Sequence, residues 1–310
     1  MLVVIRGAGD IATGIALRLH RAGIHLILTD LPQPTAVRRT VCFSEAIRLG
    51  EVQVEDITAR LAHSPREALE LTLQGTVAVL ADPEGACISA LKPDGLVDAI
   101  LAKKNLGTRM DMAPVVIGVG PGFTAGVDCH AAVETMRGHT LGRVLYTGSP
   151  IPNTGVPGNI GGYTVERVLR APADGIFEPK LEIGALVKAG DVAGMVNGQP
   201  MLCTIDGCLR GLLQAGVPVH KGMKSGDIDP RCKPEHCLTA SDKALAVGGG
   251  VLEALEEMLA VARRKVEQRG LDGRIVLDCG DAERLAAADG SVDVATVAFG
   301  GRNFGDLEAG

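Results

Sequence analysis

The sequence contains few aromatic residues: they make up 2% of its 310 residues, and tryptophan is absent. A core without large rings must be packed by Ala, Val, Ile and Leu, and hydrophobic residues make up 46% of the chain. Such an aliphatic core, together with 41 glycines, is typical of parallel α/β structure with tight turns. We therefore expect a globular α/β protein that is long enough for two domains.

Long basic runs and long apolar runs are also absent. The formal net charge is -6, and cations cluster only in short runs such as 263–265. Nucleic acid is not an expected partner, because binding it needs a concentrated basic face. No stretch approaches the roughly 20 apolar residues of a membrane span, so no membrane association is expected either.

A secretory signal is not visible at the start of the chain. Met1 leads directly into the apolar run 2–5, which ends at Arg6 and has neither a basic start nor a small-residue cleavage site. We therefore expect a cytoplasmic protein. In that reducing compartment the eight cysteines are expected to be thiols and not a disulfide framework.

The chain opens with the pattern of a Rossmann-type nucleotide-binding unit. Residues 2–5 form a wholly apolar run, as expected for a strand buried on both faces. The turn that follows reads G-A-G-D-I-A-T-G over residues 7–14. Gly7 and Gly9 take the first two glycine places of the dinucleotide fingerprint, and Ala12 takes the third.

A second strand is expected over 25–29 and ends at Asp30, where an acid bonds the ribose hydroxyls of an NAD-like ligand and disfavours a 2′-phosphate. Glycine suits the turn because the backbone must approach a phosphate without a Cβ in the way. The unit predicts a site for an NAD-like dinucleotide or another nucleotide, with these binding residues: Gly7, Gly9, Asp10, Ala12, Gly14 and Asp30. The alternative is that the glycines only permit tight strand-to-helix packing and that nothing binds.

A second glycine-rich loop follows a later apolar strand. Buried strands are expected over 76–80 and 114–119, with a helix over 91–104 between them. The latter strand runs directly into a glycine-rich loop over 120–126, and open α/β sheets bind ligands at this end of their strands. Three glycines there join the predicted cofactor site: Gly118, Gly120 and Gly122.

No residue is clearly marked as a catalytic group. The candidates are His130, Glu134 and His139. His130 and Glu134 are four residues apart, so a helix would place them on one face. Two ligands do not make a zinc site, so no metal is predicted, and ordinary polar surface or pocket lining is the simpler interpretation.

The middle of the chain contains one glycine turn twice. Residues 173–190 and 205–222 match with an offset of 32, and each has an Asp-Gly turn, a short alternating strand and a Val-x-x-Gly turn. Paired hairpins of this kind assemble into a small two-fold barrel. The unit resembles the barrel-sandwich hybrid of biotinyl and lipoyl carrier domains. Because no lysine stands between the halves at 196–201, we expect a structural platform and not a swinging-arm carrier.

Several short strings occur in a specific order within residues 1 to about 254. They are R-G-A-G-D-I-A-T-G over 6–14, G-P-G-F-T-A-G over 120–126, R-G-H-T-L-G-R over 137–143, P-N-T-G over 152–155, R-V-L-R-A-P over 167–172, and the segment 226–231. On these strings the region resembles the YqeB family, which are accessory proteins of selenium-dependent molybdenum hydroxylases.

This resemblance implies a cytosolic helper in the maturation of a molybdenum hydroxylase, related in role to xanthine dehydrogenase maturation factors. The implied partner is a hydroxylase subunit or its cofactor machinery, which links the predicted nucleotide site to the molybdenum cofactor. A homo-oligomer is compatible with that role. Three hypotheses stay open: a nucleotide-binding accessory protein, an NAD-dependent oxidoreductase, and a protein-interaction scaffold.

From residue 256 the sequence changes character. A charged amphipathic helix is expected over 256–269, followed by strands over 274–277 and 291–299. The run resembles an interior fragment of the ubiquinone/menaquinone biosynthesis methyltransferases, which use S-adenosylmethionine. The glycine-rich loop and ribose-binding acid that should precede the helix are missing, so no methyltransferase activity is expected.

These observations predict an α/β fold in four parts. A Rossmann-type nucleotide-binding-like domain is expected over 1–165 and a barrel-sandwich-hybrid-like β domain over 166–232. A return helix over 233–255 then leads into a truncated methyltransferase-like α/β tail over 256–310.

Overall fold

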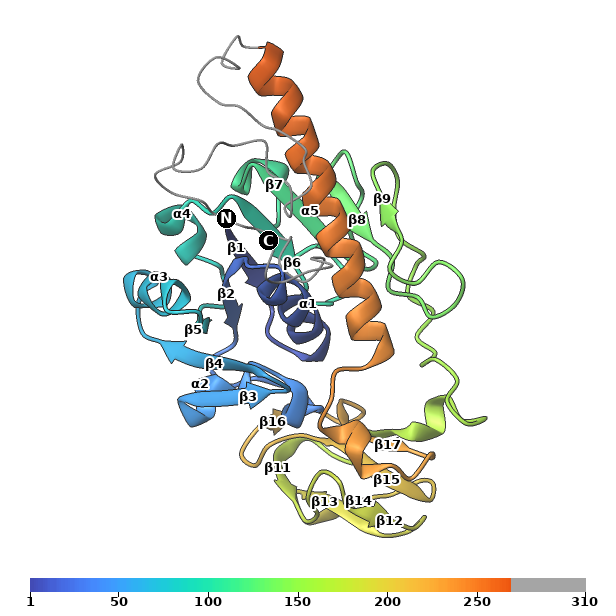
Figure 1. Cartoon of the computed structure of the whole chain (residues 1–310). Helices are drawn as coiled ribbons and strands as arrows, with labels where there is room; N and C mark the ends of the chain where they lie inside the picture. The colour runs from blue at the N-terminus through green and yellow to red at the C-terminus, as the bar shows by residue number, and fades with distance from the viewer. Residues whose placement is uncertain (269–310) are drawn as a thin grey trace, which may run out of the picture.

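The computed structural model describes residues 1–268. In it the chain forms a mixed α/β fold with one nine-stranded sheet and two four-stranded sheets. The large sheet and its helices form the upper part of the molecule in Figure 1, and the two small sheets lie below them. The α/β class expected from the sequence is confirmed.

The large sheet is parallel at its centre and antiparallel at its two edges. Its strands lie in the order β3-β4-β5-β2-β1-β6-β7-β8-β9. The strands from β4 to β8 in this order are all parallel, whereas β3 pairs antiparallel with β4, and β9 with β8. The bounds are β1 Leu2–Arg6, β2 His25–Asp30, β3 Glu51–Val54, β4 Ile57–Ala62, β5 Val77–Ala81, β6 Gly95–Asp98, β7 Val115–Val119, β8 Ala131–Val133 and β9 Val144–Leu145.

Helices cover both faces of this sheet. In β1, Val3 and Ile5 belong to one core and Val4 to another, because successive side chains of a strand point to opposite faces. The first core includes residues of α1, α2 and α5, and the second includes residues of α3 and α4. The helices are α1 Asp10–Arg21, α2 Glu45–Leu49, α3 Pro65–Leu73, α4 Cys87–Leu91 and α5 Asp242–Gln268.

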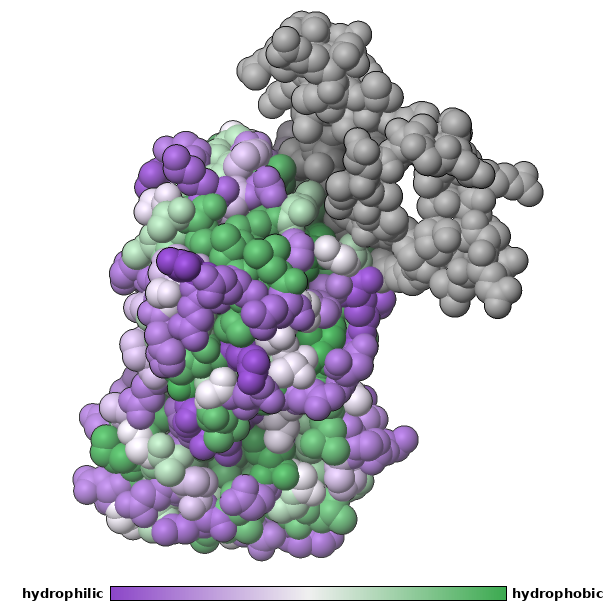
Figure 2. Space-filling model, turned by 60° about the vertical axis from the view of Figure 1, so that its left-hand side comes forward, coloured by the Kyte–Doolittle hydropathy of each residue, from purple (hydrophilic) through white to green (hydrophobic). Residues whose placement is uncertain are grey.

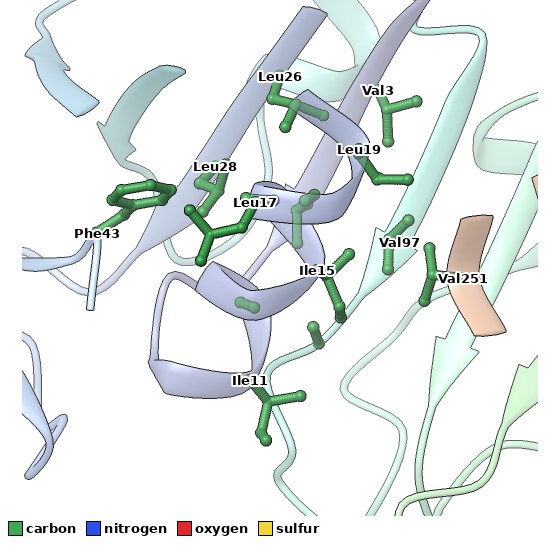
Figure 3. Close-up of a cluster of buried hydrophobic side chains, with 14 of the residues drawn as sticks. Val3, Ile11, Ile15, Leu17, Leu19, Leu26, Leu28, Phe43, Val97 and Val251 are labelled. Carbon is green, nitrogen blue, oxygen red and sulfur yellow. The ribbon is translucent and has the colours of Figure 1, made fainter. Parts of the chain in front are cut away.

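The helix α5 returns from the far end of the sequence to pack beside α1. Val251 of α5 lies beside Val97 of β6 and near Ile15 of α1 in the same buried cluster (Figure 3). The two helices cross closely because Gly14 has no side chain: a Cβ built there would lie 2.5 Å from the Cβ of Ala244. A chain segment from the C-terminal part of the sequence thus completes the core over β6, β7 and β8.

The boundary of this helix differs from the expected one. The return helix predicted over 233–255 and the helix predicted over 256–269 form one continuous α5, preceded by a single 3-10 turn at Pro234–Cys237. The strands predicted over 274–277 and 291–299 lie outside the described residues.

The strand β6 corrects the helix predicted over 91–104. Gly95–Asp98 is a buried strand between β1 and β7. A short apolar run fits a buried strand as well as a helix, so periodicity alone did not distinguish them. The helix considered for His130 and Glu134 is also wrong, because β8 occupies Ala131–Val133.

Both small sheets are built from the duplicated segment. Their strand orders are β10-β17-β15-β12 and β14-β13-β11-β16. A shift of 32 residues relates β10, β11, β12 and β13 to β14, β15, β16 and β17, so each sheet contains two strands from each half. The bounds are β10 Val168–Arg170, β11 Gly175–Pro179, β12 Leu186–Val187, β13 Val192–Val196, β14 Gln199–Leu202, β15 Gly207–Leu212, β16 Pro218–Val219 and β17 Lys224–Asp229.

The two halves hold each other by reciprocal hydrogen bonds. The Gly184 N–H donates to the carbonyl of Leu209 at 2.8 Å, and the equivalent Gly216 N–H donates to the carbonyl of Phe177 at 2.9 Å. Neither half completes its own sheets, because each strand β11 or β15 pairs with a short strand of the other half. The duplication is therefore an interlocked unit and not two separate hairpins.

The Asp-Gly turns show why the sequence repeats them. The Asp206 carboxylate accepts a hydrogen bond from the Ala189 N–H at 2.9 Å. In the other half, the Asp174 carboxylate accepts one from the Lys221 N–H at 2.7 Å. Each aspartate therefore caps the Val-x-x-Gly turn of the opposite half.

The surface mixes apolar and polar residues (Figure 2). On the face shown in Figure 2, hydrophobic patches are interrupted by hydrophilic residues. No helix in residues 1–268 has both the length and the apolar character that crossing a membrane requires. The seven described cysteines are free thiols, and Cys232 is the exposed one.

Candidate functional site

A cleft of about 930 Å³ lies between the large sheet and the duplicated β unit. Its walls include the first turn of α1, the segment 151–160, the strands β10 and β17, and the start of α5. Ligand sites in proteins typically enclose about 300–1,000 Å³ and often lie between structural units. The cleft is therefore large enough for a nucleotide-sized molecule.

The lining of the cleft is strongly cationic. Among the described residues it contains two acids, Asp10 and Asp227, and eight cationic side chains. The cations are Arg38, Lys103, Arg137, Arg167, Arg170, Arg210, Lys224 and Lys243. In a chain with a net charge of -6, this concentration is a local property of the fold. It favours an anionic ligand, because a cleft lined by one sign of charge focuses its potential on the opposite sign.

Several of the arginines are held by carboxylates. Arg167 and Arg210 both bond the buried Asp227, with N–O distances of 3.0 and 2.7 Å. Arg137 makes a two-pronged contact with Asp242 at 2.6 and 2.8 Å. These pairs fix the guanidinium groups in place, and a side chain fixed in advance loses little freedom when a ligand binds.

Arg38 links the cleft to the N-terminus of α1. It is 6% exposed, and its guanidinium lies 3.5 Å from the Asp10 carboxylate. It also donates to the carbonyl of His236 at 3.1 Å. Its Nε is buried and has no partner among the described residues.

The three lysines of the cleft differ from these arginines. Within residues 1–268, no ion pair or side-chain hydrogen bond involves Lys103, Lys224 or Lys243. Desolvation and the charge on Lys224 lower the pKa of Lys103. Desolvation and the charge on Lys103 lower the pKa of Lys243. These like charges therefore lie close enough to repel one another.

In the predicted glycine turn after β1, Gly7 packs against neighbouring backbone, whereas Gly9 has free space beside it. Gly7 has φ +98°, and a Cβ there would lie 2.8 Å from the carbonyl oxygen of Ala99. Gly9 precedes α1, and a Cβ there would meet nothing within 4 Å. Asp10 lines the cleft, whereas Ala12 is 1% exposed and belongs to the core.

Asp30 contacts the glycine turn directly. Its carboxylate accepts hydrogen bonds from the Ala8 N–H at 2.8 Å and from the Leu31 N–H at 2.7 Å. Burial raises the pKa of Asp30, and these two N–H groups partly offset that rise. In this structure Asp30 orders the turn, and two of its acceptor positions are already used.

The other predicted glycines pack against protein atoms. Gly14 lies at the α1–α5 crossing, and a Cβ on Gly118 would lie 2.4 Å from the ring of Phe123. Gly120 has φ +81°, and a Cβ there would lie 2.8 Å from the hydroxyl oxygen of Thr135. A Cβ on Gly122, whose φ is +109°, would lie 2.6 Å from the Cα of Lys104. Each of these positions needs glycine for close packing.

The three catalytic candidates are not gathered in the cleft. The Nδ1 of His130 accepts from the Val116 N–H at 3.0 Å. Both oxygens of the buried Glu134 accept backbone N–H groups, from Met136 at 2.6 Å and Ile151 at 2.7 Å. His139 is exposed. His130 and Glu134 stand at opposite ends of β8, about 13 Å apart at the rise of an extended strand.

Most of the cleft cations were missed by the sequence analysis. They come from separate parts of the chain, between Arg38 and Lys243, and none belongs to a basic run longer than the pair at 103–104. The sequence indicated this group only through the arginines of the strings at 137–143 and 167–172, three of which line the cleft.

Similarity to known proteins agrees with the first resemblance. The chain is 55% identical over 254 residues to YqeB of Escherichia coli K12, which covers 82% of this chain and 47% of YqeB. Over that span the chain is similar to YqeB. The chain thus spans about half the length of the YqeB protein that it matches.

The C-terminal part matches a different family. The profile of the ubiE/COQ5 methyltransferase family matches residues 241–310. A demethylmenaquinone methyltransferase of Thermus thermophilus is 53% identical over 51 residues, which is 16% of this chain and 22% of that enzyme. The expected resemblance of the tail to a methyltransferase fragment is confirmed. The matched region begins at the start of α5, inside the part that completes the main core.

A succinylglutamatedesuccinylase/aspartoacylase from Rhodobacter sphaeroides is similar in structure over a small part. The similarity covers 20% of this chain and 21% of that one, at 27% identity and a TM-score of 0.18. A similarity of this extent carries no conclusion about function.

Proposed function

We propose that this protein is a cytoplasmic accessory factor that binds a nucleotide, or a nucleotide-bearing cofactor, in the cationic cleft and serves the maturation of a selenium-dependent molybdenum hydroxylase. The observation that carries the binding part is the cleft itself, with eight cations and two acids in its lining. The pathway is what the resemblance to the YqeB family implies, and the identity of 55% to YqeB supports that resemblance. The free thiols support a reducing compartment.

The strand order supports a nucleotide as the ligand. Six neighbouring strands of the large sheet lie in the order β5-β2-β1-β6-β7-β8. If these six are renumbered 1 to 6 along the chain, their order is 3-2-1-4-5-6, which is that of doubly wound dinucleotide-binding sheets. In such sheets the ligand lies beyond the carboxyl ends of the strands, near the first helix. The first turn of α1 contributes Asp10 and Ile11 to the cleft at this end. We therefore assign the Rossmann-type role to this part of the chain and a platform role to the barrel-sandwich-hybrid-like unit.

An accessory role is favoured over catalysis by the partners of the candidate residues. Glu134 uses both of its carboxylate oxygens to hold backbone N–H groups, and His130 holds the N–H of Val116. A general base must reach a substrate proton within hydrogen-bond distance. The chemistry is therefore assigned to the partner hydroxylase or its cofactor machinery, and this chain presents a ligand.

An NAD-dependent oxidoreductase is the second candidate, because Asp30 stands at the end of β2, where dinucleotide-binding folds place the acid that bonds the ribose. To bind ribose, Asp30 would have to give up a contact with Ala8 or use a remaining acceptor position. The oxidoreductase hypothesis predicts a substrate-dependent change in nicotinamide absorbance, and the accessory hypothesis predicts none.

Isothermal titration of the full chain with NAD, NADP, ATP and molybdenum-cofactor nucleotides tests the proposal. We expect binding of at least one of them, and weaker binding by an Arg38→Gln variant. The matched control is Arg66→Gln, because Arg66 lies on the exposed face of α3 and, among residues 1–268, pairs only with Glu70. A folded wild-type protein that binds none of these ligands overturns the nucleotide-binding part.

A further inference from the structure

Three lysines that reach the cleft come from three different elements. Lys103 follows β6, Lys224 begins β17, and Lys243 lies in the first turn of α5. Among the residues that the structure describes, none of the three is ion-paired. Asp10 is the nearby acid, and it attracts Lys103 and Lys243 without a salt-bridge contact to either.

Most arginines of the cleft differ from the lysines in this respect, and only Arg170 among the described cleft arginines likewise makes no ion pair. In the same cleft Arg137 is neutralised by Asp242, and Arg167 and Arg210 are neutralised by Asp227. Carboxylates therefore offset part of the arginine charge, whereas the three lysines have no carboxylate partner among the described residues. Three ammonium groups that line one cleft repel one another, which favours a bound anion that carries more than one negative charge.

The backbone that carries Lys103 is held in an unfavourable conformation. Leu101 has φ +59° and Lys103 has φ +65°, both in the left-handed region. That region costs roughly 1–2 kcal/mol for a residue with a Cβ, and such strain persists where surrounding structure enforces it. Two unfavourable residues so close together mark this segment as constrained by its packing.

The enforcing contacts come from the two glycine turns. Gly7 approaches the segment at Ala99, and a Cβ on it would lie 2.8 Å from the Ala99 oxygen. Gly122 approaches at Lys104, where a Cβ would lie 2.6 Å from the Cα. The two glycine turns therefore pack against opposite ends of the segment 99–104 and restrict its conformation. Their glycines act on the ligand indirectly, by placing Lys103 at the cleft.

We propose that Lys103, Lys224 and Lys243 form a subsite for the diphosphate group of the ligand. Three ammonium groups offer nine N–H donors to the oxygens of a diphosphate ester, as charge-assisted hydrogen bonds. Because the lysines belong to the large sheet, the β unit and α5, the bound diphosphate bridges all three. The inference rests on the proposed function and adds the chemical class that this part of the cleft selects.

Calorimetric titration of the full-length protein with inorganic pyrophosphate tests the subsite. We expect pyrophosphate to bind more tightly than inorganic phosphate, and binding to weaken as salt rises, since salt screens the charges. Lys103→Gln, Lys224→Gln and Lys243→Gln are each expected to lower the affinity about tenfold or more, because each removes hydrogen bonds to a charged group. Thermal unfolding of each variant verifies that it is folded.

Lys104→Gln is the matched control. Lys104 is the chain neighbour of Lys103, is exposed, and does not line the cleft. Its variant is expected to bind pyrophosphate as the wild type does. A loss in Lys104→Gln equal to that in Lys103→Gln overturns the subsite, as does a wild-type protein that does not bind pyrophosphate.

The outcome separates the subsite from the proposed function. A nucleotide that binds the wild type and the triple lysine variant equally well overturns the subsite and leaves nucleotide binding intact. Lysine-dependent binding of pyrophosphate, without binding of any nucleotide, supports the subsite and contradicts the nucleotide part of the proposed function.

Discussion

At the scale of single residues, the close crossing of α1 and α5 depends on glycines, which have no side chain to separate the two helices. Gly14 packs against Ala244. A Cβ added to Gly248 would lie 2.8 Å from the carbonyl oxygen of Gly14. Any added carbon at these positions must displace backbone. Gly249 lies one residue further along α5, is exposed, and has open space around it.

Alanine substitutions at Gly14 and Gly249 test this packing. Both are helical, so each gains about 1 kcal/mol of helix propensity when glycine becomes alanine. Gly14→Ala must also push Ala244 away, and overpacking costs roughly 1–3 kcal/mol. We expect its free energy of unfolding in urea to lie below that of Gly249→Ala by about that amount. Equal stability of the two variants would show that the crossing tolerates a methyl group.

Asp229 is a residue whose charge matters for stability. Its side chain is fully buried, and Arg210 and Arg231 bond its carboxylate. Desolvation opposes ionisation, but the hydrogen bonds from Arg231 and the charge on Arg210 outweigh it and hold the pKa of Asp229 well below its usual value. Because the folded pKa is lowered, the ionised carboxylate contributes stability above the unfolded pKa of about 4, and that contribution is lost as the pH falls.

We expect Asp229→Asn to cost about 3–5 kcal/mol at pH 7, the usual effect of removing one partner of a buried ion pair. The difference from wild type is expected to shrink as the pH falls from 5 toward 2, as measured by denaturant unfolding. Asp242→Asn is the control. Asp242 has its pKa lowered to about 2 by the hydrogen bonds from Arg137, but its side chain is 72% exposed, so its loss is expected to have a small effect. A pH-independent difference for Asp229→Asn would contradict this account.

At the scale of elements, the duplicated strands make a matched pair of tests. Val187 of β12 and Val219 of β16 are equivalent in the two halves, and they are 4% and 6% exposed in one core. Val187→Ala and Val219→Ala are each expected to lower the free energy of unfolding by about 1.5–3 kcal/mol, which is the value of a buried valine. Urea unfolding measures both.

Val192→Ala provides the comparison for these two, since Val192 is 38% exposed in β13. Its effect is expected to be clearly smaller. If the losses of unfolding free energy in Val187→Ala and Val219→Ala differed from each other as much as from that of Val192→Ala, the two halves would not contribute equally to the shared core.

Much of the element content could be predicted from local patterns. The apolar runs ending at Arg6, Asp30 and Val119 correspond to β1, β2 and β7, because a strand buried on both faces requires a continuous apolar run. β6 was missed because its four residues continue into Ile100 and Leu101, which extends the apolar pattern to helical length. The repeat was visible in the sequence, but the exchange of strands between its halves was not, since matching residues do not reveal which strands pair.

The site was less predictable than the fold, for a physical reason. The glycines at 7 and 122 were identified by their pattern, yet they contact the segment 99–104. Which side of a glycine turn faces a ligand depends on the segments that pack against it. Likewise Lys103 and Lys243 are far apart in the sequence, and only the return of α5 places them in one cleft.

At the scale of the whole molecule, the proposed ligand site is lined by regions that are similar to two different families. The sequence related to YqeB supplies the large sheet and the β unit, while the region that matches the methyltransferase profile begins at residue 241. Lys243 therefore lies where the two similarities overlap. The proposed subsite predicts that a bound diphosphate contacts each of these regions, so its binding free energy would add to the contacts that hold them together.

Scanning calorimetry with and without pyrophosphate tests that consequence. A ligand that binds only the folded state stabilises it by RT ln(1 + [L]/Kd), which is about 2.7 kcal/mol at a concentration of 100 Kd. We expect the unfolding midpoint to rise with pyrophosphate concentration in wild type and in Lys104→Gln, but not in the triple variant of Lys103, Lys224 and Lys243. Because the bound anion links the large sheet to the β unit, the transitions of the two are also expected to move together. A rise confined to one of two separate transitions would place the anion within a single unit, and a rise in the triple variant would place it away from the lysines.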